Sequence, residues 1–370
     1  MRRNDTMGII LTREDNIPPI TDIRAIDALP IAGRYRIIDF VLSNMANAGI
    51  VNIGVATTSK YSSLMDHIQS GRPWDLDRKK QGLTILPPDL RNAAIKGDID
   101  LLASAKNFIN HSHQTYVILT LEAGVYNIDF KKVIKKHIES QADITMVYKD
   151  LSGNDEKELS RFTLIDIDKE NRVTDIEVKP FYPKTSNASL GIYVMEKALL
   201  ESIVDECSAR GDHDFIKDAI AKKMEGLRIY AYEHKGYADI IDSMSSYYRN
   251  NMLFLTKEMR DEIFNPKSPV YTKAKDQTPA KYGEEAVVKN SCISDGCVIE
   301  GTVINSVLSR SVKVKKGAVV KNSIIMQGSV IEEGAELDHV VFDKDVNITK
   351  GRKLIGQDSY PLAIAKGSII

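Results

Sequence analysis

The chain has 370 residues, 43% of them hydrophobic, which is enough to build the cores of two domains. Its formal charge is −1, so we expect neither a nucleic-acid surface nor a membrane surface. The sequence shows no apolar run long enough to span a bilayer and no signal-peptide pattern. Its three cysteines form no CxxC pair, which predicts free thiols in a reducing cytoplasm rather than disulfides or a zinc site.

Strand and helix patterns alternate through residues 1–264. Continuous apolar runs are typical of buried strands, and we expect strands at 7–11, 52–57, 83–86, 116–121, 144–148 and 190–195. Amphipathic stretches predict helices at 38–45, 60–70, 98–110, 130–140, 198–207 and 215–224, and one long helix at 240–262. This alternation indicates an α/β domain with a mainly parallel sheet, followed by a proline- and lysine-containing linker at 265–282.

From residue 283 to the end, one short motif repeats. The pairs Asn290-Ser291, Asn305-Ser306, Asn322-Ser323 and Asp338-His339 follow one another at steps of 15, 17 and 16 residues, each before two apolar residues. Aliphatic residues recur every five or six positions inside each unit, and glycines mark the corners. This is a hexapeptide repeat, and it predicts a left-handed parallel β-helix of about five coils.

The segment after the first strand lacks the residues that hold a phosphate. Thr12–Asn16 contains no glycine, although a phosphate cradle needs close backbone approach and positive φ. Glu14 and Asp15 would repel a triphosphate, and Pro18 and Pro19 have no N–H to donate. We therefore expect ATP to bind weakly or not at all at this loop.

Two longer stretches carry a family resemblance. GRYRIIDFVLSNMANAGI at 33–50 and RPWDLDRKKQGLTILPP at 72–88 are similar to glucose-1-phosphate adenylyltransferase, also called ADP-glucose pyrophosphorylase, as are SNASLGIYVM at 186–195 and HDF at 213–215. The resemblance covers nearly the whole chain and implies a Rossmann-like nucleotide-diphospho-sugar transferase domain before the left-handed β-helix. It is strongest to the regulatory, weakly catalytic subunit that some bacteria pair with a catalytic one in glycogen biosynthesis.

The resemblance also implies a reaction whose residues are altered here. In the family, glucose 1-phosphate attacks the α-phosphate of ATP, and two aspartates hold Mg²⁺. The first lies in a Gly-Asp-His pattern after the central strand, where this chain has Leu121-Glu122-Ala123-Gly124. The second lies in an Asp-Val-Gly pattern, where this chain has Asp239-Ile240-Ile241-Asp242, and we interpret Asp242 as a helix N-cap or first-turn acid. We therefore expect no catalytic residue, no bound metal and no cofactor.

Two groups of binding residues are carried over from the family. Lys179 keeps the lysine of a Glu-Lys-Pro motif, and Asn187 and Ser189 also match, so we expect a vestigial sugar-phosphate site unless Lys179 is only a surface lysine. Arg24 and Arg36 match arginines that contribute to an effector-anion site between the two domains, and arginine suits phosphate because its fork binds two oxygens. The alternative for Arg36 is a structural pair with Asp39 or another acid.

These observations predict a regulatory, catalytically deficient subunit of glucose-1-phosphate adenylyltransferase. We expect it in the cytoplasm, in a homo- or heterotetramer with a catalytic subunit, and responsive to a phosphorylated or anionic effector. One alternative is an active adenylyltransferase that uses Glu122 and Asp239. A less favoured alternative is a hexapeptide-repeat acyltransferase that uses His339, the single histidine of the repeats.

Overall fold

The computed structural model describes residues 5–12, 17–88 and 95–370 and divides into two compact units. The first unit consists of residues 1–13, 40–240 and 267–270, and the second of residues 14–39, 241–266 and 271–370. Both units are assembled from separate segments, whereas the boundaries predicted at 264 and 283 simply cut the chain in order. Within the described part of the chain, no helix is both long and apolar enough to cross a membrane.

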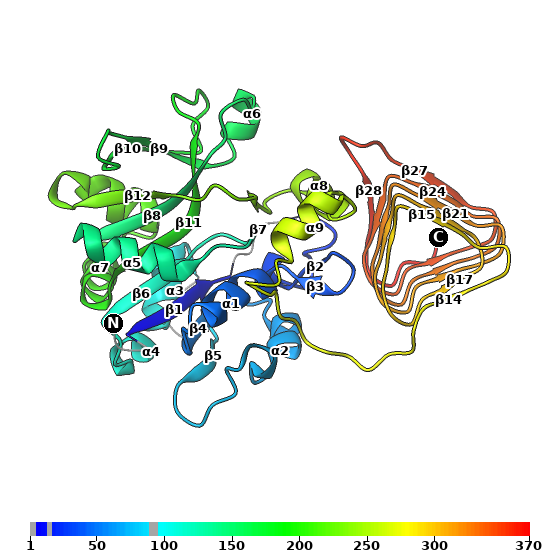
Figure 1. Ribbon diagram of the computed structural model, residues 1–370, viewed down its shortest axis with the longest axis horizontal. Coiled ribbons are helices and arrows are strands. Elements are labelled where there is room, and N and C mark those ends of the chain that lie inside the picture. Colours follow the sequence, from blue (N-terminus) through cyan, green and yellow to red (C-terminus); the bar gives the residue numbers. More distant parts are fainter. Residues whose placement is uncertain (1–4, 13–16, 89–94) are drawn as a thin grey trace. The chain divides into compact units, whose positions relative to one another are not determined.

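The first unit is built on one mixed sheet (Figure 1). Its main path runs β10-β9-β11-β6-β1-β4-β5, with β8 paired to β11 and β12 paired to β8. The run β6-β1-β4-β5 is parallel, as the alternating pattern predicts, whereas β11 lies antiparallel to β6 and β8. The strands are β1 (Thr6–Leu11), β4 (Asn52–Ala56), β5 (Gly82–Leu86), β6 (Tyr116–Thr120), β8 (Ile144–Asp150), β9 (Thr163–Ile167), β10 (Val173–Val178), β11 (Asn187–Glu196) and β12 (Ile229–Glu233).

Helices cover both faces of this sheet because its strands are apolar on both sides. Met7, Ile9 and Leu11 of β1 join one buried cluster with residues of α3 (Asp98–Ser104), α4 (Lys106–His111) and α7 (Lys197–Arg210). Side chains alternate along a strand, so Gly8 faces the other way, and a Cβ there would lie 2.5 Å from Met45 Sδ of α1 (Ile38–Asn47). The face that holds α1 also holds α5 (Phe130–Ser140), where His137 contacts Thr145 of β8. Shorter helices are α2 (Ser62–Ile68) and α6 (Glu156–Leu159).

Three helix predictions need correction. The expected helix at 98–110 is two helices, α3 and α4, and the expected helix at 215–224 is a π-helical turn, Phe215–Ile220, followed by a 3-10 turn, Ala221–Gly226. The single helix at 240–262 is wrong, because β13 (Ala238–Ile240) precedes two helices, α8 (Met244–Leu253) and α9 (Lys257–Ile263). Thr256 starts α9 by accepting a hydrogen bond from Met259 N.

Asp242 is not the N-cap that the sequence indicated. The N-cap of α8 is Ser243, whose side chain accepts from Ser246 N, and the Ser246 hydroxyl accepts from Ser243 N in return. Asp242 lies one residue earlier and accepts from the Ser246 hydroxyl at 3.0 Å. Ser246, in the third position of the helix, thus completes a capping box with Ser243, and Asp242 lies just before it.

The second unit contains the predicted left-handed β-helix, visible in Figure 1 as a three-sided coil. Three parallel five-stranded sheets have the orders β14-β17-β20-β23-β26, β15-β18-β21-β24-β27 and β16-β19-β22-β25-β28, which confirms five coils. The strands are β14 (Lys281–Tyr282), β15 (Val287–Lys289), β16 (Cys292–Ile293), β17 (Val298–Ile299), β18 (Thr302–Ile304), β19 (Val307–Leu308), β20 (Lys313–Val314), β21 (Val319–Lys321), β22 (Ile324–Ile325), β23 (Val330–Ile331), β24 (Glu336–Asp338), β25 (Val340–Phe342), β26 (Asn347–Ile348), β27 (Lys353–Ile355) and β28 (Leu362–Ile364).

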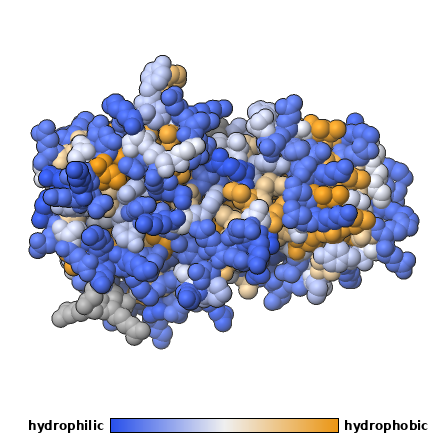
Figure 2. All heavy atoms as spheres, turned by 45° about the horizontal axis from the view of Figure 1, so that its top comes forward, coloured by the Kyte–Doolittle hydropathy of each residue, from blue (hydrophilic) through white to orange (hydrophobic). Residues whose placement is uncertain are grey.

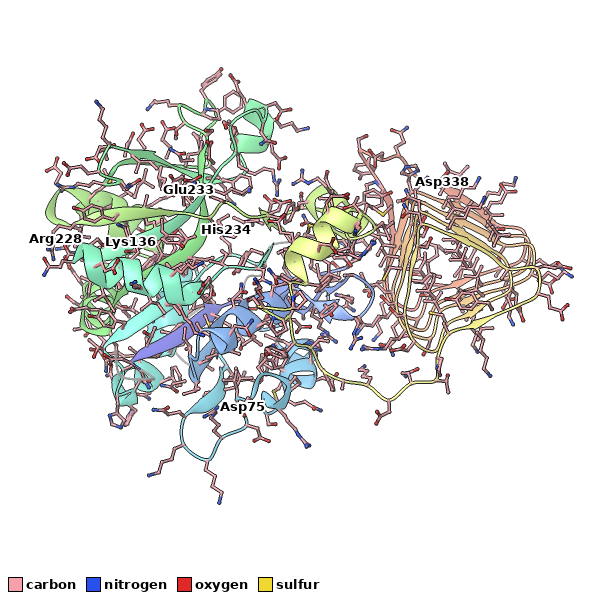
Figure 3. The ribbon with its side chains drawn as sticks, viewed as in Figure 1. Asp75, Lys136, Arg228, Glu233, His234 and Asp338 are labelled. Carbon is pink, nitrogen blue, oxygen red and sulfur yellow. The ribbon has the colours of Figure 1, made fainter. Side chains whose placement is uncertain are left out.

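The repeated Asn-Ser motif forms two ladders at one corner of the coil. Asn290 donates its side-chain amide to Asn305, Asn305 donates to Asn322, and Asn322 donates to Asp338 at 2.9 Å. All three asparagines have positive φ, which asparagine tolerates better than most residues. The following serines add a second ladder, in which the hydroxyl of each accepts from a backbone N–H one coil later. Asp338, labelled in Figure 3, ends the first ladder because a carboxylate only accepts.

One sheet of the coil is covered by other segments of the same unit. Val307, Ile324 and Val341 point away from the coil interior, yet each is at most 2% exposed. The cover includes the hairpin of β2 (Pro30–Ile31) and β3 (Tyr35–Arg36), where Gly33 approaches Ser294 so closely that a Cβ would lie 2.6 Å from its hydroxyl. It also includes α8, whose residue Tyr248 donates its hydroxyl to Asn322 O.

Candidate functional site

Three buried threonine hydroxyls mark the carboxyl ends of the parallel strands in the first unit. Thr12 follows β1, Thr58 follows β4 and Thr120 ends β6, and each is at most 6% exposed. None of the three hydroxyls has a hydrogen-bond partner among the described residues. Buried polar groups normally pair, so these atoms indicate a polar ligand or water position where α/β sheets usually bind ligands. Arg13–Asn16, including the acidic pair Glu14 and Asp15, lies outside the described residues.

Glu122 is fixed by a bulge in β11. The pairing register of β11 with β8 shifts between Ser189 and Ile192, and Leu121 N donates to Gly191 O at 2.8 Å. Gly191 has a φ of +67°, and a Cβ there would lie 2.4 Å from Glu122 Cγ. Only glycine fits this position, because any other residue would push Glu122 away from the strand end. No aspartate stands in the described turn between β6 and β7 (Gly124–Tyr126).

Asp239 is buried on β13, where it faces an arginine. Its Oδ1 accepts from Ile240 N at 2.9 Å and lies 3.5 Å from Nη2 of Arg161. The same Nη2 donates to Ile240 O at 2.8 Å, and Nη1 pairs with Glu158. Sequence reasoning missed Arg161, because a contact between residues 78 positions apart leaves no local pattern.

The Mg²⁺ site that the family resemblance implies does not fit this donor set. Asp239, the acid nearest to the family's second aspartate, already contacts a guanidinium, and a second cation beside it would be repelled. Glu122 faces the β11 bulge, and the described residues contain no group of three or more histidines, cysteines, aspartates or glutamates that could hold a metal ion.

The structure places the expected sugar-phosphate residues on two strands. Asn187 and Ser189 lie two positions apart on β11 and so share a face. The Asn187 amide donates to Ile165 O at 3.3 Å, and the Ser189 hydroxyl accepts from Gly191 N at 3.3 Å. Lys179 follows β10, two strands away in the order β10-β9-β11, and is exposed with a φ of +46°. Sugar-phosphate binding by these residues stays a prediction.

Arg24 and Arg36, the expected effector-anion residues, are both buried in the second unit. Arg24 is 1% exposed, and its Nη1 donates to Asp343 Oδ1 at 2.8 Å and to Ile20 O at 2.9 Å. Arg36 is 7% exposed and donates to Ala28 O at 3.1 Å, while its backbone N donates to Asp39 at 2.9 Å. Each arginine therefore has a structural role, which leaves anion binding as a prediction.

Lys344 joins these arginines and was not expected from the sequence. Burial, the largest cause, and the positive charges of Arg36 and Arg24 together lower its pKa to about 8. Asp343 acts in the opposite direction, since its carboxylate favours the charged ammonium. The contributions of Arg36 and Arg24, which are smaller than that of burial, indicate a positive local potential, which attracts an anion. Residues more than 300 positions apart form this cluster, so no sequence spacing predicts it.

The single histidine of the repeats lies in a structural environment. His339 is the neighbour of Asp338, with its Nδ1 2.7 Å from Asp338 Oδ1, and its ring lies 6.3 Å from that of Tyr248. These contacts hold α8 against the coil and give the less favoured acyltransferase alternative no support.

Comparison with known proteins identifies the family of both halves of the chain. A nucleotidyl transferase family model matches residues 15–257, and a model for the GlmU-like C-terminal hexapeptide matches residues 274–361. The chain is 36% identical to the glycogen biosynthesis protein GlgD of Bacillus subtilis over 100% of this chain and 98% of that protein. It is 35% identical to a glucose-1-phosphate adenylyltransferase of Thermosipho melanesiensis over 80% of this chain and 73% of that protein. The corresponding enzyme of Clostridium novyi is 33% identical, over 80% of this chain and 78% of that protein. The chain therefore belongs to the nucleotidyl transferase family, among the glucose-1-phosphate adenylyltransferases and their relative GlgD.

Proposed function

We propose that this chain is a regulatory, catalytically deficient subunit of glucose-1-phosphate adenylyltransferase in glycogen biosynthesis. The observation that carries the proposal is the end of β6, where Glu122 is held against Gly191 and no aspartate stands before β7. The full-length similarity to a glycogen biosynthesis protein supports the pathway. Adenylyl transfer develops negative charge on the phosphates, and without an aspartate to hold a divalent cation at this strand end the reaction loses stabilisation that it needs.

The partner in this proposal is a catalytic glucose-1-phosphate adenylyltransferase subunit, in a homo- or heterotetramer. The coil offers surface for such an assembly, because hydrophobic residues lie between hydrophilic ones on the face turned forward in Figure 2. One outward row of the sheet that contains β15 and β27 runs Lys289, Ile304, Lys321, Asp338 and Ile355, and Ile355 is 69% exposed. An exposed aliphatic residue on a rigid sheet supports docking of another subunit.

The regulator in this proposal is a phosphorylated or otherwise anionic effector bound near Arg24, Arg36 and Lys344. Their shared positive potential supports an anion site, and Lys344 is the member best placed to respond, since it is half-buried and not locked in an ion pair among the described contacts. We place the protein in the cytoplasm, in keeping with its three free cysteines.

The alternative of an active enzyme is distinguished by assay of the isolated chain. We expect pyrophosphate release from ATP and glucose 1-phosphate at least a thousandfold below that of a catalytic relative, because losing about 4 kcal/mol of transition-state stabilisation costs that factor. A matched pair of variants identifies the source of any residual rate. If Glu122→Gln and Asp239→Asn leave the residual rate unchanged, that rate depends on neither acid. A turnover of the unchanged chain within tenfold of the catalytic relative contradicts the proposal.

A further inference from the structure

Arg161 sits among oxygen atoms from two distant parts of the first unit. Its Nη2 lies 3.5 Å from the Asp239 carboxylate and 2.8 Å from Ile240 O, and its Nη1 pairs with the Glu158 carboxylate. Two carboxylates and a backbone carbonyl are hard oxygen ligands, the kind that Mg²⁺, Mn²⁺ and Ca²⁺ prefer in proteins. The guanidinium therefore lies where the surrounding oxygens would otherwise favour a divalent cation.

The guanidinium is held rigidly and largely out of water. The Arg161 side chain is 17% exposed and that of Asp239 is 8% exposed. Leu159 and Phe162, on either side of Arg161 in sequence, pack with Ile240 in one buried cluster, and the Phe162 ring centre lies 5.1 Å from Arg161 Cζ. Glu158 is in turn fixed in α6, where its backbone N donates to the N-cap Asp155. A cation placed this firmly needs little ordering to hold its partners.

A bound arginine and a divalent metal compete for the same carboxylate. A guanidinium beside Asp239 neutralises the charge that would attract the metal, and a metal would bring two positive charges next to a fixed one. Arginine also stays charged throughout the accessible pH range, so no change in pH frees the carboxylate. Competition between the guanidinium and a metal for this carboxylate therefore does not depend on the protonation of the arginine.

We propose that Arg161 is a resident counter-ion that fills the cation position at Asp239 and excludes divalent metal from it. This inference rests on the proposed function, because it names a physical cause of the catalytic deficiency. It makes an additional statement about the chain itself. With Arg161 removed, Glu158 and Asp239 are left as two negative charges around the space of a guanidinium, and together they recruit a divalent cation.

The test is a Mn²⁺ titration of the full chain. Binding is detected as the loss of the free Mn²⁺ signal in electron paramagnetic resonance. We expect Arg161→Gln to bind one Mn²⁺ at least tenfold more tightly than the unchanged chain, and the double variant Arg161→Gln/Asp239→Asn to lose that gain. Arg228→Gln is the matched control, since Arg228 (labelled in Figure 3) pairs with Asp143 at 2.9 Å on a more exposed surface. We expect this control to bind Mn²⁺ as the unchanged chain does.

Two results would overturn the inference: no gain in Arg161→Gln that circular dichroism shows to be folded, or Mn²⁺ binding by the unchanged chain that is lost in Asp239→Asn. The second comparison does not need Arg161→Gln, so it decides the question even if that variant does not fold. Neither measurement involves substrate or a partner subunit. If the unchanged chain is inactive but binds Mn²⁺ at Asp239, this inference is wrong and the proposed function stands. If the unchanged chain is active and binds no Mn²⁺ at Asp239, the proposed function is wrong and this inference stands.

Discussion

Lys344 shows how single residues acquire roles that their neighbours in sequence do not reveal. Its ammonium lies in a region made positive by Arg24 and Arg36, two arginines that are themselves committed to Asp343 and to backbone carbonyls. The resemblance identified the arginines but not the lysine.

We predict that anion affinity at this cluster falls as the pH rises through about 8. Only the protonated ammonium attracts the anion, and the pKa of Lys344 is lowered to about 8 by burial and by Arg36 and Arg24, so the charge is lost above that pH. Calorimetry with pyrophosphate from pH 7 to pH 9 measures this. Lys344→Gln should bind weakly and without this pH dependence, whereas Lys316→Gln, on an exposed pair with Glu285, should match the unchanged chain. Equal pH dependence in both variants would exclude Lys344 from the site.

A second residue-scale prediction concerns acid stability. Burial lowers the pKa of His137 to about 4 from an ordinary value of 6.5, and its Nδ1 lies 2.9 Å from Thr145 Oγ1. Between these two pH values the unfolded chain binds a proton that the folded chain does not, so stability falls as the pH drops from 6.5 to 4. Because one pKa unit corresponds to about 1.4 kcal/mol, we expect a loss of about 2 kcal/mol between pH 7 and pH 4.5.

Urea unfolding at pH 7 and pH 4.5 measures this loss. His137→Gln removes the titrating ring and should reduce the fall in unfolding free energy between the two pH values. His111→Gln, on the exposed end of α4, serves as the control and should leave that fall in place. A fall of the same size in His137→Gln would show that other groups cause the acid sensitivity.

At the scale of elements, the asparagine ladder ties successive coils together. Asn322 accepts from Asn305, donates to Asp338 at 2.9 Å and adopts a φ of +45°. Asn322→Gly keeps that conformation and loses only the side-chain hydrogen bonds, which should cost about 1–2 kcal/mol. Asn322→Ala also strains the backbone and should cost about 1 kcal/mol more. Thermal unfolding of the two variants separates the loss of the side-chain hydrogen bonds from the backbone strain. Equal losses of stability in the two variants would show that alanine adopts the positive φ without strain.

Some of these helices and strands could be predicted from the sequence, and others could not. The strands β1, β4 and β6 and the helix α5 follow directly from apolar runs and amphipathic spacing, and the β-helix follows from the repeated Asn-Ser pairs. The long helix at 240–262 was wrong because serine and threonine caps inside the segment, at Ser243 and Thr256, start new helices in an otherwise periodic stretch. The antiparallel insertion of β11 has no local signature, since pairing partners are chosen by the whole sheet.

Some residues of the candidate site could likewise be predicted from the sequence, and others could not. Lys179, Asn187, Ser189, Arg24 and Arg36 could be named from motifs, but the motifs do not reveal that Lys179 lies two strands from Ser189. Gly191, Arg161 and Lys344 act through contacts with residues far away in sequence, namely Glu122, Asp239 and the two arginines. Such contacts depend on the folded chain, so only the three-dimensional structure reveals them.

At the scale of the molecule, the chain combines a nucleotidyl transferase unit, with no aspartate in the described turn after β6, and a β-helix of five coils. A partner that binds this chain better in one of its own conformations is shifted toward that conformation by the difference in affinity. A coupling of about 1–3 kcal/mol, typical of allostery, changes effector sensitivity roughly 5- to 150-fold. In the function that we propose, the chain therefore regulates its partner through this difference in affinity and needs no turnover of its own.

The most direct test is to measure pyrophosphate release by a catalytic glucose-1-phosphate adenylyltransferase of the same cell while this chain is added in increasing excess, with light scattering on the same mixtures. Our account predicts one mixed oligomer, no rate from this chain alone, and at least a fivefold change in the effector concentration that half-activates the catalytic subunit. Two separate homo-oligomers, with the partner's turnover, substrate affinity and effector response unchanged by excess of this chain, would contradict it.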